Sequence, residues 1–193
     1  ALEESGHADD TVVVFTTDHG DMAGGHGMVW KSTSAFYDDV MRVPLVMSYP
    51  GVIKQGRSSV AACKTDMMPT LLDLAGQSVP GQVQGRSLVP WLTGKSADAD
   101  GPQFSFSERV PPRGDGKRGV LPGTKGSFAI RGDDWKYIRY AGGDEYLYHL
   151  ADDPGETRNL AGNPEYSDKR DELLARMAQW LRRTGWPDAV ARM

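Results

Sequence analysis

The chain has 193 residues and a formal net charge of −4, with 39% hydrophobic and 25% charged residues. This length allows one domain or a domain with an appendage, and the composition is that of an ordinary globular protein. No apolar run approaches the roughly 18 residues of a membrane-spanning helix, and no basic tract favours nucleic-acid binding. Neither a membrane nor a nucleic acid is therefore an expected partner. The single cysteine, Cys63, excludes an internal disulfide.

The first predicted strand covers residues 12–15. Residues 1–6 before it are typical of a helix that ends near Gly6, as if the chain began inside a larger domain. The run Val-Val-Val-Phe is apolar and mostly β-branched, which predicts a strand buried on both faces, as in a parallel sheet. Open α/β sheets bind ligands at the carboxyl ends of such strands, where Asp18 and His19 lie.

The glycine-rich loop after this strand gathers Asp18, His19, Asp21, His26 and Lys31. A carboxylate and an imidazole can share a divalent cation, with oxygen favouring Ca²⁺, Mg²⁺ or Mn²⁺ and imidazole adding Zn²⁺. Lys31 supplies a compact positive charge, and a metal with a lysine would hold a phosphoryl or sulfuryl group. The alternative is a loop with solvated polar side chains. The acidic spacing excludes an EF-hand.

Helices and strands are predicted to alternate up to residue 94. Apolar spacing with proline and glycine positions predicts helices over 33–41 and 66–75, strands over 45–49 and 59–64, and a helical turn over 88–92. Asp66 is expected to cap the second helix. The core side chains of that helix are expected to be Met67, Leu71, Leu74 and Ala75. Cys63 is expected to be a small buried side chain in the preceding strand.

The remainder of the chain predicts a small antiparallel sheet. Alternating apolar and polar residues predict about four strands, over 104–107, 128–131, 135–140 and 145–150. Gly132 and the two aspartates after it indicate a hairpin turn. Residues 110–126 are rich in proline and glycine and indicate a long loop. His149 lies on a strand rich in aromatic residues, which favours a structural role over metal ligation.

A terminal helix is predicted after Asn163, which is expected to cap it with Pro164 at its first position. An apolar stripe at helical spacing is expected to pack on the small sheet, and it comprises Leu173, Leu174, Met177, Trp180 and Leu181.

Several motifs in one order resemble the sulfatase family of the alkaline-phosphatase-like superfamily. They are Thr17-Asp18-His19-Gly20-Asp21, Gly25-His26-Gly27 and Lys31, then residues 36–46, 66–76, 85–94 and 148–161. The resemblance covers nearly the whole chain and is weakest over 95–125. It implies an α/β fold: part of an alkaline-phosphatase-like core sheet over residues 1–94, with a small antiparallel C-terminal sheet and terminal helix over 95–193.

The same resemblance implies roles for the loop residues. In sulfatases the paired aspartate and histidine ligate Ca²⁺, which assigns metal ligation to Asp18 and His19. The lysine thirteen positions after the aspartate contacts the sulfate ester, which corresponds to Lys31. His26 is a candidate for substrate contact, and the alternative is a loop histidine bonded to backbone.

The nucleophile of the family is missing from these residues. Sulfatases convert a cysteine or serine in a Cys/Ser-x-Pro-x-Arg motif to formylglycine, and Cys63 lacks both the proline and the arginine. The chain is therefore expected to be the C-terminal portion of a sulfatase, inactive alone, with formylglycine in an absent N-terminal half. Its expected partners are a sulfate-ester substrate and that half or a second copy of itself, since a half-sheet exposes an apolar face.

The sequence is also compatible with two other functions. Phosphonate monoester hydrolases and phosphodiesterases of the same superfamily share the pattern of Asp18, His19, Gly20, His26 and Lys31. A truncated, non-catalytic metal-binding module is the second. The location stays open between periplasmic or secreted and cytoplasmic.

Overall fold

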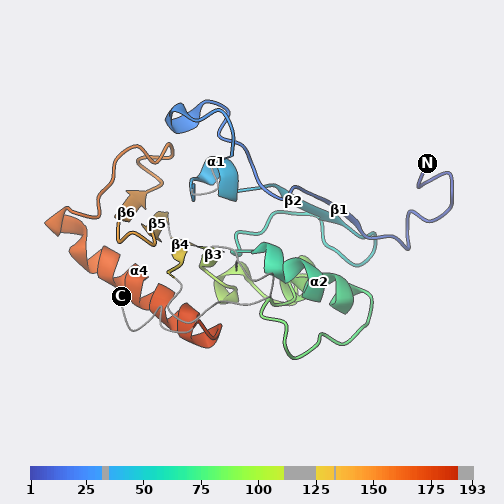
Figure 1. Cartoon of the computed structure of the whole chain (residues 1–193). Helices are drawn as coiled ribbons and strands as arrows, with labels where there is room; N and C mark the ends of the chain where they lie inside the picture. The colour runs from blue at the N-terminus through green and yellow to red at the C-terminus, as the bar shows by residue number, and fades with distance from the viewer. Residues whose placement is uncertain (32–34, 111–124, 133, 187–193) are drawn as a thin grey trace, which may run out of the picture. The chain divides into compact units, whose positions relative to one another are not determined.

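The computed structural model describes residues 1–31, 35–110, 125–132 and 134–186. It contains two compact units, residues 1–103 and residues 104–193 (Figure 1). The first unit holds β1 (Val13–Thr16), η1 (Gly25–Gly27), α1 (Asp38–Met41), β2 (Leu45–Ser48), η2 (Lys64–Asp66), α2 (Met67–Leu74), α3 (Val89–Leu92) and η3 (Asp98–Asp100). The predicted α/β class is confirmed.

The two strands of the first unit pair with each other in antiparallel register, Val13 opposite Ser48 and Phe15 opposite Val46 (Figure 1). Val13, Phe15 and Val46 share one face of this ribbon, and they are 47%, 65% and 59% exposed. The prediction of a parallel strand buried on both faces is therefore wrong for the described part of the chain. A β-branched run indicates that a strand prefers burial, but it does not specify what covers it.

The helix predicted from Asp66 begins two residues earlier. Residues 59–63 are irregular rather than a strand, and Cys63, which is only partly buried, is the N-cap of η2. The Asp66 carboxylate accepts the Cys63 N–H at 2.8 Å, as the third residue of a capping box does. Asp66 stands at the predicted N-cap position of α2, but its side chain makes no capping bond to α2 and instead reaches back to the Cys63 N–H.

The buried residues of α2 are Pro69 and Thr70, rather than the residues predicted to form its core, Met67, Leu71, Leu74 and Ala75. Thr70 is fully buried, and its hydroxyl donates to the Asp66 carbonyl at 2.6 Å and accepts the Leu88 N–H at 2.9 Å. The Asp66 carboxylate also accepts the Arg86 N–H at 2.9 Å. Leu71, predicted to lie in the core, is 40% exposed. Helical periodicity indicates a common face, but contacts with the rest of the fold decide which face is buried.

A close backbone contact holds the loop after β1 against α1. The Gly20 N–H donates to the Val40 carbonyl at 2.8 Å, and a Cβ at Gly20 would lie 1.8 Å from the Asp39 carbonyl oxygen. Only glycine fits at this distance. Val40 also packs with Met22 in a small apolar cluster.

The second unit is an antiparallel sheet covered by a helix, as predicted. Its elements are β3 (Ser105–Arg109), β4 (Ser127–Gly132), β5 (Trp135–Arg139), β6 (Glu145–His149), η4 (Pro164–Tyr166) and α4 (Ser167–Arg183), and the strand order is β3-β4-β5-β6. The Asn163 side chain accepts the Glu165 N–H at 3.1 Å, which confirms the predicted cap. Most of the predicted loop over 110–126 lies outside the described residues.

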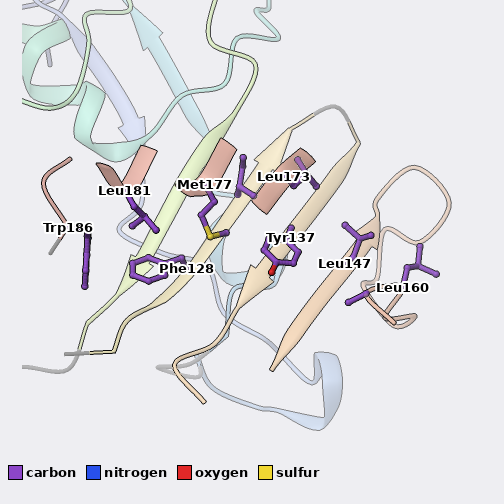
Figure 2. Packing of buried hydrophobic residues seen from close by; sticks show 10 residues of the cluster. Phe128, Tyr137, Leu147, Leu160, Leu173, Met177, Leu181 and Trp186 are labelled. Carbon is purple, nitrogen blue, oxygen red and sulfur yellow. The ribbon is translucent and has the colours of Figure 1, made fainter. Parts of the chain in front are cut away.

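The core of this unit lies between α4 and the sheet (Figure 2). Leu173, Met177 and Leu181 of α4 are at most 1% exposed and pack with Phe128 and Tyr137 of the sheet. Leu174 and Trp180 are partly buried against the same cluster. The predicted stripe is confirmed, because its 3.6-residue spacing matches the face that the sheet covers.

A buried ion pair joins Lys136 of the same sheet to Glu156. The Lys136 ammonium of β5 lies 2.6 Å from a carboxylate oxygen of Glu156, and the two side chains are 2% and 3% exposed. At this depth the two opposite charges stabilise each other, because both side chains are shielded from bulk water. Nothing in the local sequence pattern singled this pair out.

We expect the substitution Gly20→Ala to destabilise the first unit by about 1–3 kcal/mol, because its Cβ displaces the Asp39 carbonyl and breaks the bond to Val40. Urea unfolding followed by circular dichroism measures the change. Gly81→Ala is the matched control, since a Cβ at Gly81 meets nothing within 4 Å. Equal unfolding midpoints for the two variants would contradict the close-contact explanation.

We expect Lys136→Met to destabilise the second unit by about 3–5 kcal/mol, because it removes the ammonium that lies against the buried Glu156 carboxylate. The control is Lys169→Met, whose pair with Glu172 has side chains 31% and 36% exposed and should change stability by less than about 1 kcal/mol. Chemical denaturation followed by tryptophan fluorescence distinguishes the two. Similar losses would show that burial of the pair is unimportant.

Candidate metal and anion site

The imidazole of His19 lies at the end of β1 with each ring nitrogen against a partner. Its Nδ1 is 2.7 Å from the Gly20 carbonyl oxygen, and its Nε2 is 2.7 Å from the Lys31 ammonium. A carbonyl only accepts and an ammonium only donates, so Nδ1 carries the proton and Nε2 presents its lone pair. This is the tautomer that a metal-ligating histidine with a backbone partner adopts.

The Asp18 carboxylate lies beside that lone pair. One oxygen is 3.4 Å from His19 Nε2, and the other accepts the His19 N–H at 3.0 Å and the Thr17 hydroxyl at 3.2 Å. The slight burial of Asp18 raises its pKa, but the neighbouring His19 and these hydrogen bonds outweigh that effect and hold the pKa below its usual value. Asp18 is therefore ionised at neutral pH, with an oxygen facing the same space as His19 Nε2.

These two side chains fit a divalent cation as part of a ligand set. They offer one carboxylate oxygen and one imidazole lone pair, which suit Ca²⁺, Mg²⁺, Mn²⁺ or Zn²⁺. Among the described residues, no group of three or more His, Cys, Asp or Glu side chains is placed to hold a metal ion. Asp18 and His19 can hold a metal only together with oxygen ligands from water or another segment, and Lys31 must first leave the lone pair of His19.

The structure brings Asp18, His19 and Lys31 together, and it places His26 differently. His26 lies in η1 with φ of 51°, and its ring stacks on Tyr37 with centroids 3.7 Å apart and planes 11° apart. The ring is exposed and remains accessible to a ligand. Stacking on Tyr37 is an arrangement that neither of the sequence interpretations included.

Lys64 is a site residue that the sequence did not indicate. Its ammonium donates to the Thr17 carbonyl, adjacent to Asp18. The two residues lie 47 positions apart in the chain, so no local motif joins them and only the fold brings them into contact. Lys64 was predicted merely to end a short strand.

His149 in the second unit is placed as a structural residue. Its Nδ1 lies 2.6 Å from the Asp152 carboxylate, and its ring packs against Trp135 with centroids 4.4 Å apart.

Within the described residues, no helix has the length and apolar character needed to span a membrane.

Comparisons with known proteins agree on one family. The sequence model described as N-sulphoglucosamine sulphohydrolase, C-terminal, matches residues 24–183. An N-acetylglucosamine-6-O-sulfatase of Bacteroides thetaiotaomicron is 36% identical over 179 residues, which cover 90% of this chain and 30% of that protein.

Solved structures are similar over the same extent. A protein solved in complex with its substrate D-glucosamine-2-N,6-O-disulfate superposes with a TM-score of 0.82 at 31% identity, covering 100% of this chain and 38% of that one. A phosphonate monoester hydrolase from Silicibacter pomeroyi gives a TM-score of 0.77 at 31% identity, covering 98% and 38%.

The chain thus spans about a third of the length of these relatives, 30% to 38%. The family match includes Lys31, the α2 region and the whole small sheet with α4. The chain belongs to the sulfatase family, of which it represents the C-terminal region.

Proposed function

We propose that this chain is the C-terminal part of a sulfatase that hydrolyses a sulfate ester of a saccharide. The observation that carries the proposal is the meeting of the Asp18 carboxylate, the His19 lone pair and the Lys31 ammonium at the end of β1. The saccharide is proposed because one relative is named an N-acetylglucosamine-6-O-sulfatase and a similar structure holds a sulfated glucosamine.

Asp18 and His19 are proposed to supply two ligands of a Ca²⁺ ion, as the family resemblance implies. When bound, such a cation would stabilise negative charge on the oxygens of the sulfate group. The Gly20 carbonyl would keep the His19 lone pair turned toward the ion through its bond to Nδ1. Mg²⁺, Mn²⁺ and Zn²⁺ are alternatives with the same two donors.

Lys31 is proposed to bind an anionic oxygen of the ester. Its ammonium carries three donors and a compact charge, and it already lies at the ligand side of His19. A cation held by His19 would repel this ammonium, which would then be available to an oxygen of the sulfate. His26, whose exposed ring stacks on Tyr37, is proposed as a second substrate contact.

The nucleophile is proposed to come from the part of the protein outside this chain. Formylglycine would supply it there, and Cys63, which caps η2, has another role here. All large hydrophobic side chains that are exposed among the described residues lie in the first unit, including Phe15 and Val46 on one face of the β1–β2 ribbon. We propose that the remaining part of the sulfatase covers this face, rather than a second copy.

Hydrolysis of a phosphonate ester is the second candidate. It is favoured by the likeness to a phosphonate monoester hydrolase at 31% identity. The Lys31 ammonium and the metal ion would bind either anion, since the sulfate and the phosphonate group both present negatively charged oxygens. The relative kcat/KM values for the two ester classes therefore decide between them.

We expect the full-length protein to show a higher kcat/KM for glucosamine 6-sulfate than for a phenylphosphonate monoester. Lys31→Met should lower kcat/KM for the sulfate about 10²–10³-fold, because it removes a charged donor from the anion. Lys95→Met, an exposed lysine of the same unit, is the control. A preference for the phosphonate would favour the second candidate, and full activity of Lys31→Met would refute the anion role.

We expect Asp18→Asn to weaken Ca²⁺ binding to the full-length protein at least about tenfold, because an amide oxygen carries no net charge for the cation. Isothermal titration calorimetry measures the affinity. Asp21→Asn is the matched control, since Asp21 is exposed in the same loop. If the two variants lose the same affinity, general charge rather than ligation explains the effect.

A further inference from the structure

Two lysines from distant parts of the chain reach the same three residues. The Lys31 ammonium contacts His19, and the Lys64 ammonium donates to the carbonyl of Thr17. Asp18, the proposed metal ligand, lies between these two contacts in the chain. Lys31 is accounted for by the anion that it is proposed to bind, but the position of Lys64 has no such explanation.

The segment that carries Lys64 is held rigidly. Asp66 is 4% exposed and its carboxylate accepts the N–H groups of Cys63 at 2.8 Å and Arg86 at 2.9 Å. A Cβ at Gly85 would lie 1.9 Å from the Thr65 carbonyl oxygen, so the chain at Gly85 is in direct contact with the backbone beside Lys64. Lys64 therefore extends from a fixed base.

Thr17 links Lys64 to Asp18, the proposed metal-ligating residue. Its hydroxyl donates to the Asp18 carboxylate at 3.2 Å and lies 3.1 Å from the His19 carbonyl. An ammonium that holds the Thr17 carbonyl therefore holds the residue whose hydroxyl makes both contacts. Outer partners of this kind orient metal ligands, and their loss typically costs 10–100-fold in metal affinity.

We propose that Lys64 is a positioning residue of the metal site, which holds the Thr17–His19 backbone so that Asp18 and His19 face one cation. This inference rests on the proposed metal-binding function. It predicts that removing the Lys64 ammonium lowers Ca²⁺ affinity, whereas simple electrostatics predicts that the affinity rises. A positive charge near a cation site repels the cation, so removing it would raise Ca²⁺ affinity if Lys64 acted only through its charge.

The test is calorimetric titration of Ca²⁺ alone into the full-length protein and its variants. Lys64→Met should weaken Ca²⁺ binding about tenfold or more while leaving the thermal midpoint of the metal-free protein unchanged. Lys64→Arg retains charge and donors and should bind Ca²⁺ within about threefold of the unchanged protein. Lys95→Met removes an exposed lysine of the same unit and should have no effect.

Unchanged or tighter Ca²⁺ binding by Lys64→Met would overturn the positioning role. If Asp18→Asn abolishes binding in the same experiment, the proposed metal site stands and only the role of Lys64 falls. If the unchanged protein binds no Ca²⁺, both proposals fall. Should Lys64→Met unfold, weak binding by a folded Lys64→Gln supports the role, and tight binding by it overturns the role.

Discussion

The close contact between Gly20 and α1 is the constraint on which the candidate site depends. The Gly20 N–H is bonded to Val40, and the absence of a side chain lets the Asp39 carbonyl approach. The Gly20 carbonyl, on the same residue, holds Nδ1 of His19. One glycine thus anchors the loop to the fold and sets the tautomer of the proposed metal ligand, so the two functions cannot be separated by substitution at this position.

The two units achieve stability in different ways. The second unit buries a continuous core between α4 and the four-stranded sheet, and it contains the buried ion pair between Lys136 and Glu156. The first unit instead exposes apolar side chains on its ribbon, such as Phe15 at 65%. Apolar surface of this kind is stabilised by burial, so the first unit is the one expected to need a covering surface.

Buried polar contacts join separate segments of the first unit. Asp66 and Thr70 are both nearly inaccessible and bind backbone groups of residues 86 and 88. Buried groups of this type must be satisfied, and a satisfied network specifies one arrangement of the segments that it joins. The same network supports Lys64, which connects the start of α2 to the end of β1.

Local sequence patterns predicted the small sheet, the terminal helix and the grouping of three candidate site residues. The four antiparallel strands, the Asn163 cap and the stripe of α4 followed from periodicity and capping residues, because these depend on neighbours in the chain. The grouping of Asp18, His19 and Lys31 also followed from one short stretch, and the structure brings all three together.

Only the tertiary structure decided the antiparallel pairing of β1 with β2, the exposure of Leu71, and the places of His26 and Lys64. Each depends on contacts between residues far apart in the chain or on surface that remains uncovered. Periodicity shows that a segment prefers burial and a residue type shows which bonds it can form. The partner that buries the segment, or accepts the bond, is selected by the fold, because local preference is compatible with several partners.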